Sequence, residues 1–141
     1  MRLIIKAMAV TSGAAAVAVA LALIACGDPK YQPPAIVVTF SPYSPPPAAL
    51  NTGTTTGIAA VVANDPKNAG VNFTCVPAGD CGSFNPAQIA SNVLTCYQAP
   101  GTVPSGGTVT LTATSLSDPT KSISSAPITI SMGDPVSGCT P

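Results

Sequence analysis

Cysteine offers the most reactive side chains in this 141-residue sequence, which contains five of them. One stands near the amino terminus and four lie in the second half: Cys26, Cys75, Cys81, Cys96 and Cys139. Thiols can carry a lipid, form disulfides or bind a metal ion. Acid–base catalysis has little support, because the sequence has no His and no Glu, and its five Asp residues lie in predicted turns beside Pro or Gly. No imidazole is present to activate a Ser or Cys nucleophile, so we predict a protein without enzymatic activity.

The residues before Cys26 have the layout of an export signal. Arg2 and Lys6 provide a basic start, and residues 7–25 form a largely apolar run. The run leads into Leu23-Ile24-Ala25-Cys26, which resembles a lipobox. This arrangement resembles that of bacterial lipoprotein precursors. The resemblance implies cleavage before Cys26, a diacylglyceryl group on its sulfur and a further acyl chain on the new amino terminus.

An uncleaved transmembrane helix is the alternative for residues 7–25, because their number approaches the roughly 20 apolar residues that span a bilayer. The run is dominated by Ala and Val instead of Leu and Phe, which weakens insertion. We therefore expect a lipoprotein of the cell envelope, held at the membrane by acyl chains on Cys26. Gly27 stands where lipoproteins of diderm bacteria usually carry an Asp as inner-membrane retention signal. The resemblance thus implies the outer membrane in preference to the inner membrane.

The four cysteines of the second half form an even set in a chain that we expect to be exported, where disulfides can form. Cys75 and Cys81 flank a short turn, so a local disulfide between them is the favoured arrangement. Cys96 would then pair with Cys139 and tie residues 133–141 back to the domain.

Two other arrangements of these cysteines compete with the local pairing. Cys75 could join Cys96 through the core if Leu94 faces inward, and four cysteines permit three pairings in all. A zinc site is the second competitor, but the sequence lacks both His and the CxxC spacing that such sites use.

The composition limits the fold and the partners. Removal of residues 1–25 would leave 116 residues, which is enough for one domain. This part contains three Lys and five Asp, and its net charge is therefore −2. It has no basic patch to neutralise phosphates, so we expect no nucleic-acid partner. The 16 Pro and 12 Gly of the sequence, with many Thr, Ser and Val, favour short strands and turns.

The sequence divides into four segments. We expect a signal peptide at 1–25, a lipidated cysteine with a Pro-containing tether at 26–34, a β-sandwich of the immunoglobulin-like kind at 35–132 and a C-terminal tail at 133–141. A second Pro-rich stretch, residues 41–47, follows the first predicted strand. Because proline cannot donate a ladder hydrogen bond, we expect this stretch at an edge or in a crossover, and a Pro-rich recognition ligand is the alternative.

Within residues 35–132, β-branched runs alternate with turn signals. Strands are predicted over 35–40, 54–63, 71–75, 93–97, 108–115 and 122–131. Apolar alternation directs one face of these runs inward: Thr56, Ile58, Ala60, Val62, Val71, Phe73, Cys75, Val109, Leu111, Ala113, Ala126, Ile128 and Ile130. Residues 85–90 have the pattern of a short helical turn, with Asn85 as the cap and Pro86 at the first helical position. About seven short strands at this spacing predict an all-β, antiparallel sandwich.

Several short motifs resemble the framework of the bacterial immunoglobulin-like repeats found in cell-surface proteins. They are Asn51-Thr52-Gly53-Thr54, Asn64-Asp65-Pro66 with Gly70-Val71-Asn72-Phe73, Cys81-Gly82-Ser83-Phe84, Tyr97-Gln98-Ala99-Pro100 with Val103-Pro104, and residues 109–115 with 118–122. The similarity covers about residues 35–131 and implies an immunoglobulin-like sandwich. In that family a Trp commonly stands where this chain has Phe73.

Two aspartates are the candidates for a metal site. In an immunoglobulin-like topology the connections 64–70 and 117–121 lie at the same end, so Asp65 and Asp118 could approach a common calcium ion. Both residues also fit Asp-Pro turns, in which the carboxylate bonds to its own backbone. We favour the turns and expect no metal and no other cofactor.

These features together predict a lipid-anchored module of the cell envelope with a non-catalytic structural, adhesion or protein-interaction role. Its partners would be envelope proteins or glycans, besides the membrane. A carbohydrate-binding or surface adhesion module is one alternative, and a spacer subunit of an envelope assembly is another. Sugar binding would need exposed aromatic side chains, and six are available: Tyr31, Phe40, Tyr43, Phe73, Phe84 and Tyr97.

Overall fold

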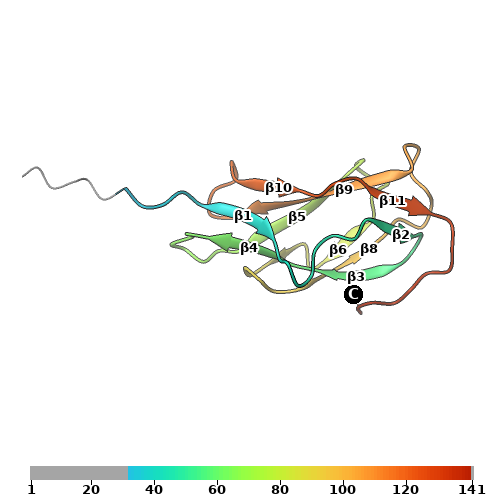
Figure 1. The fold of residues 1–141 in the computed structure, drawn as a ribbon, viewed down its shortest axis with the longest axis horizontal. Helices are drawn as coiled ribbons and strands as arrows, with labels where there is room; N and C mark the ends of the chain where they lie inside the picture. Colours follow the sequence, from blue (N-terminus) through green and yellow to red (C-terminus); the bar gives the residue numbers. More distant parts are fainter. Residues whose placement is uncertain (1–31, 141) are drawn as a thin grey trace, which may run out of the picture. The chain divides into compact units, whose positions relative to one another are not determined.

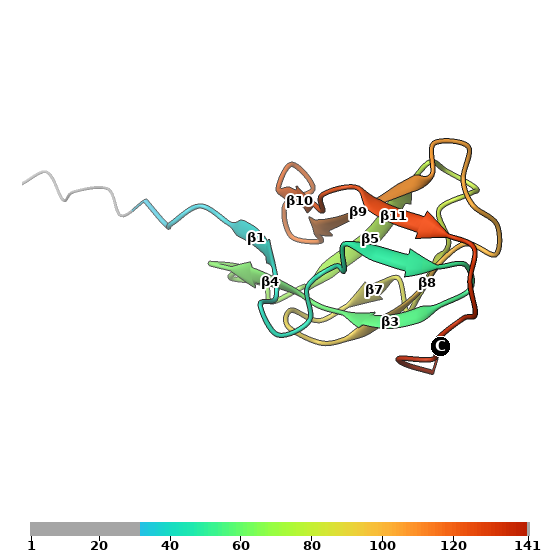
Figure 2. The same cartoon turned by 45° about the vertical axis from the view of Figure 1, so that its right-hand side comes forward.

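The computed structural model describes residues 32–140, which form eleven β-strands and contain no helix (Figure 1, Figure 2). The strands are β1 (Val37–Phe40), β2 (Ala49–Asn51), β3 (Thr55–Ile58), β4 (Ala60–Ala63), β5 (Val71–Val76), β6 (Ser83–Asn85), β7 (Gln88–Ile89), β8 (Thr95–Gln98), β9 (Thr108–Ser115), β10 (Ser122–Ser124) and β11 (Ile128–Ser131). Residues 32–140 accordingly offer no helix that could span a bilayer. The predicted signal segment and the lipidation site Cys26 lie outside the described residues.

The strands form two layers. In the first layer β1 pairs with β4, and the neighbouring ladder has the order β3-β8-β6; only Ala59 separates β3 from β4 along the chain. In the second layer the order is β2-β11-β9-β5-β7, with β10 also paired to β9. Figure 1 shows β10, β9 and β11 along one side of the molecule and β4 and β3 along the other. The described residues from Pro34 onward belong to one compact unit.

One apolar core lies between the layers. The strand β9 contributes Val109, Leu111 and Ala113, all at most 1 % exposed, while the threonines between them are half-buried. This alternation confirms the pattern predicted for residues 108–115, because a half-buried strand directs every second side chain inward. Residues from both layers complete the core: Val38, Ile58, Ala60, Val62, Val71, Phe73, Cys81, Tyr97, Ala99, Ile128 and Ile130. The all-β sandwich predicted from the sequence is therefore correct at this level.

The Pro-rich stretch after β1 is a crossover between the layers. It leaves β1 in the first layer and leads to β2 in the second, where β2 pairs with β11. The chain keeps its direction through this crossover, so β2 lies parallel to β11, with Leu50 opposite Ile130. This pair is an exception to the predicted antiparallel sandwich.

The predicted strand over residues 54–63 is divided in two. The backbone of Ala59 bonds to the crossover, since Ser41 N donates to its carbonyl oxygen (2.9 Å) and its own N–H donates to Ser44 O (3.1 Å). These bonds replace ladder bonds and separate β3 from β4. The prediction that Thr56 belongs to the core is wrong, because its side chain is only half-buried.

The predicted strand over residues 122–131 is also divided. Between β10 and β11, Ser125 N donates to Leu111 O, and Pro127 has no N–H to donate. Ala126 is exposed in this break, so its predicted core position is wrong. Such interruptions explain why eleven strand segments occur where about seven were expected.

The helical turn predicted over residues 85–90 is absent from the described structure. Asn85 ends β6, and Gln88–Ile89 form β7 beside β5, where Val71 pairs with Ile89. Phe73 N also donates to Ala87 O at 2.8 Å. Pairing with β5 thus outweighs the local helical preference of six residues, which is too few for a stable helix.

The strand predicted at residues 93–97 begins two residues later. Val93 N donates to Ala90 O in a turn, and Val93 and Leu94 are 45 % and 57 % exposed. The apolar run therefore begins on the surface, and β8 starts at Thr95.

Candidate functional site

The described cysteines form two disulfides, Cys75–Cys81 and Cys96–Cys139. This is the pairing that the sequence favours. The competing Cys75–Cys96 bond required Leu94 to face inward, whereas Leu94 is exposed. No group of three or more His, Cys, Asp or Glu side chains within residues 32–140 is arranged to hold a metal ion.

The Cys75–Cys81 disulfide closes the turn after β5, with Cα atoms 5.7 Å apart. Cys81 is buried, and its carbonyl oxygen accepts a hydrogen bond from the hydroxyl of Tyr97. Gly82 follows with φ of +91°, and a Cβ there would collide with the carbonyl oxygen of Gln98. The left-handed backbone and the close approach together require glycine at this position.

Tyr97 is the largest fully buried side chain among residues 32–140. Its ring contacts Phe84 with a centroid distance of 5.0 Å, and Phe84 stacks on Phe73 at 5.3 Å. Burial raises the pKa of Tyr97 from its ordinary value of 10.0 to about 12, and the hydroxyl is a protonated donor at neutral pH at either value. These aromatic rings are therefore part of the packed interior of the domain.

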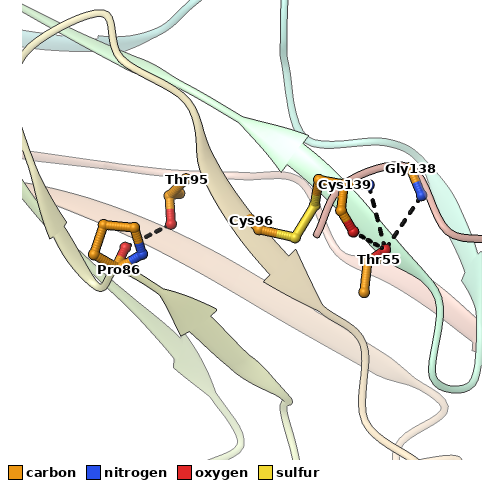
Figure 3. The surroundings of a disulfide bond; sticks show 6 residues. All are labelled: Thr55, Pro86, Thr95, Cys96, Gly138 and Cys139. Carbon is orange, nitrogen blue, oxygen red and sulfur yellow. Dashed lines mark hydrogen bonds between the residues drawn. A yellow bond between two sulfur atoms is a disulfide. The ribbon is translucent and has the colours of Figure 1, made fainter. Parts of the chain in front are cut away.

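The Cys96–Cys139 disulfide ties the C-terminal segment to β8, and hydrogen bonds of Thr55 hold the segment against the neighbouring β3 (Figure 3). Thr55 Oγ1 donates to the carbonyl oxygen of Cys139 (2.8 Å) and accepts from the backbone N–H groups of Gly138 (3.2 Å) and Cys139 (3.4 Å). Thr54 Oγ1 accepts from Val136 N at 3.1 Å. Both hydroxyl groups are thus occupied in holding this segment.

Two hollows border the C-terminal segment. One, with a volume of about 440 Å³, lies between β2, residues 54–56 and the side of the segment at Val136 and Gly138. The other, of about 310 Å³, lies beside the disulfide and includes the exposed Leu94. The described residues around both hollows carry hydroxyl, amide and apolar groups, with no nucleophile–base pair.

Asp65 and Asp118 lie in adjacent loops at one end of the sandwich, as predicted. The loops meet where Leu116 N donates to Gly70 O (3.0 Å) and the Ser117 hydroxyl donates to Asp65 Oδ1 (2.6 Å). The Asp65 carboxylate also accepts from backbone N–H groups two and four residues later, at 2.9 and 2.8 Å. Asp118 Oδ1 accepts from the backbone and the hydroxyl of Thr120 (3.0 and 2.7 Å). Both carboxylates therefore serve the turn structure at this end of the sandwich, and Asp65 also links the two loops through Ser117.

These hydrogen bonds predict a loss of stability in acid. The Ser117 hydroxyl, followed by the backbone donors, lowers the pKa of Asp65, and the Thr120 hydroxyl lowers that of Asp118. A lowered folded-state pKa stabilises the fold above the unfolded pKa of about 3.9, and this contribution is lost as the pH falls through the folded value. We expect the melting temperature of the wild type to fall below about pH 4, and that of Asp65→Asn to fall less. A scan from pH 6 to pH 2.5 measures this, with Asp80→Asn as the control; equal slopes for wild type and Asp65→Asn would contradict the prediction.

The aromatic residues do not form an exposed platform within the described part of the chain. Phe73 and Tyr97 are buried, and Phe40 and Phe84 are partly buried. Tyr43 is 92 % exposed and lies in the crossover. The stacking surface that sugar binding commonly uses is therefore not present among residues 32–140.

Sequence reasoning missed Thr54, Thr55 and the hydroxyl of Tyr97 as structural determinants. The pairing of Cys139 with Cys96 indicated that the C-terminal segment returns to the domain, but not which strand receives it. No family model, curated protein or solved structure matches this chain.

Proposed function

We propose that this chain is a lipid-anchored, immunoglobulin-like module of the bacterial envelope that acts by contact and not by catalysis. The strand order is the observation that carries the fold assignment. Immunoglobulin domains place strands A, B, E and D in one sheet and C, F and G in the other. Here β1, β3 with β4, β8 and β6 follow the first order, and β5, β9 and β11 follow the second.

The crossover supports the same assignment. The first strand of the domain is shared between the sheets, because β1 pairs with β4 and its continuation β2 pairs with β11. The extra strand β7 beside β5 extends the second sheet, as additional strands do in variable-type domains.

The proposed role is contact with envelope proteins. Glycan stacking has little support from the described aromatic side chains, of which Tyr43 is fully displayed. Exposed apolar side chains instead occur at several places, among them Val93, Leu94 and Val136. Protein interfaces commonly combine such apolar residues with a polar surround. A role as a structural subunit of an envelope assembly belongs to the same class of function.

The anchor is tested at Cys26. In a bacterial host, the wild-type chain should incorporate labelled palmitate and fractionate with the membranes, because its acyl chains partition into the bilayer. Cys26→Ala should lose the label and the membrane association, whereas Thr11→Ala, a change away from the lipobox, should retain both. Labelling of the Cys26→Ala variant, or an unlabelled wild type with its leader intact, would contradict the anchor.

The protein-contact role is tested by crosslinking in the native envelope. A photo-crosslinker placed at Leu94 should capture a defined protein, and one placed at Asp80, in the turn closed by the Cys75–Cys81 disulfide, serves as the control. Equal, unspecific capture at both positions would contradict a protein interface at this surface.

A further inference from the structure

Residues 136–139 behave as a short strand added to β3. Thr55 N donates to Val136 O at 2.9 Å, and Gly138 N donates to Thr55 O at 2.9 Å, which gives a parallel bridge between Thr55 and Ser137. A Cβ at position 138 would lie 2.7 Å from the Thr55 carbonyl oxygen. Close packing against β3 therefore requires glycine at position 138, directly before Cys139.

This edge of the first layer would otherwise be open. On its other side β3 pairs with β8, and β1 pairs only with β4, which follows β3 after the break at Ala59. An open edge exposes unpaired backbone groups that readily accept another strand. The segment 136–139 fills this position.

The connection to the segment adds little to its recognition. Residues 132–135 lead from β11 in the second layer to β3 in the first, and Met132 is 86 % exposed. The side-chain hydrogen bond of this connection joins Asn51 Nδ2 to Asp134 O at 3.1 Å. The contacts that recognise the segment thus belong to residues 136–139 on one side and to Thr54, Thr55 and Cys96 on the other.

We propose that the β3 edge also accepts residues 136–139 of a second copy of this chain, so that two copies exchange these segments and become joined by Cys96–Cys139 disulfides. Every contact described for the segment can form equally between copies, as in domain swapping. A short connection gives an attached segment an effective concentration of about 1 mM, so dilute copies bind their own segment. Copies that are concentrated on a membrane bind the segment of a neighbour. Copies whose residues 132–135 are too short to bring the segment to their own β3 edge do the same.

The exchange proceeds by thiol–disulfide chemistry with a small thiol as catalyst. The thiolate attacks Cys96 Sγ of one copy, forms a mixed disulfide there and releases the Cys139 thiolate. This thiolate attacks Cys96 of a second copy, and the bond formed replaces the bond broken. The Cys139 thiolate released from the second copy then attacks the mixed disulfide on the first copy and regenerates the small thiol. No net oxidation occurs.

The experiment mixes ¹⁵N-labelled and unlabelled full chain in detergent and adds a low concentration of reduced glutathione. Free thiols are then alkylated, and the protein is digested without reduction. Mass spectrometry then detects Cys96–Cys139 peptides with one labelled and one unlabelled half. Deletion of Gly133 and Asp134 should prevent the segment from reaching its own edge and raise the mixed peptides at least about tenfold. Insertion of a Gly-Ser pair at the same place should leave them at the wild-type level.

A second variant keeps the proposal testable if the deletion fails to fold. In a variant that ends at Met132, the β3 edge is open and Cys96 is free to react with a peptide of residues 133–140 in which Cys139 carries a glutathione mixed disulfide. It should do so at least about tenfold faster than with a scrambled peptide, and the same peptide with Gly138→Val should lose this advantage. Three results would overturn the proposal. The first is an equal rate for all three peptides, and the second is a monomeric deletion variant with free Cys96 and Cys139 thiols. The third is mixed peptides that contain Cys75 and Cys81 as often as Cys96 and Cys139.

Discussion

Replacing Tyr97 by alanine should lower the free energy of unfolding by about 3–5 kcal/mol, the usual cost of truncating a buried aromatic side chain. Tyr97 is 0 % exposed and packs against Phe84 in the aromatic cluster of the core. The truncation would leave a cavity and remove the donor to the Cys81 carbonyl oxygen. Urea denaturation measures the change, and Tyr43→Ala, at a position 92 % exposed, is the control, expected within about 0.5 kcal/mol of the wild type.

Tyr97→Phe separates the two contributions. It keeps the ring and removes the hydroxyl, so it should cost about 1–3 kcal/mol through the unsatisfied carbonyl of Cys81. A Tyr97→Ala variant as stable as Tyr43→Ala would show that the ring is not part of the core and would contradict the packing described above.

Removal of the Cys96–Cys139 disulfide should lower the free energy of unfolding by about 4 kcal/mol in the chain-entropy model, because it closes a loop with a sequence separation of 43. The Cys75–Cys81 disulfide, with a separation of 6, should contribute about 2 kcal/mol by the same model. The double variants Cys96→Ala/Cys139→Ala and Cys75→Ala/Cys81→Ala compare the two directly.

The denaturant dependence gives a second measurement on these variants. Loss of the longer loop expands the unfolded chain, so the m-value should rise in Cys96→Ala/Cys139→Ala. An unchanged m-value with a loss below about 1 kcal/mol would contradict a stabilising role for this disulfide.

The parts of the fold that sequence reasoning predicts well are those in which local pattern and burial agree. The run Thr108–Ser115 alternates without interruption and forms β9 with the predicted inward face. Phe73 is also a core residue, as expected. Alternation of this kind depends only on neighbours along the chain, so it is readable without knowledge of the partners of the strand.

The features that escaped prediction depend on contacts between distant residues. Nothing in the pattern at Ala59 marks it as a break, because the break arises from hydrogen bonds with Ser41 and Ser44. Leu94 has the apolar character of a strand residue, yet it lies on the surface before β8. The docking of residues 136–139 on β3 likewise arises from Thr54 and Thr55, more than 80 residues earlier in the sequence.

At one edge of each layer the last strands, β6 and β7, contain three and two residues. Their free sides therefore offer only a few backbone groups to a foreign chain, which limits the growth of fibrils by edge-to-edge addition. On a crowded surface, association between neighbouring molecules is therefore directed to the other edge of the first layer, where the sequence of residues 136–139 decides which chains join.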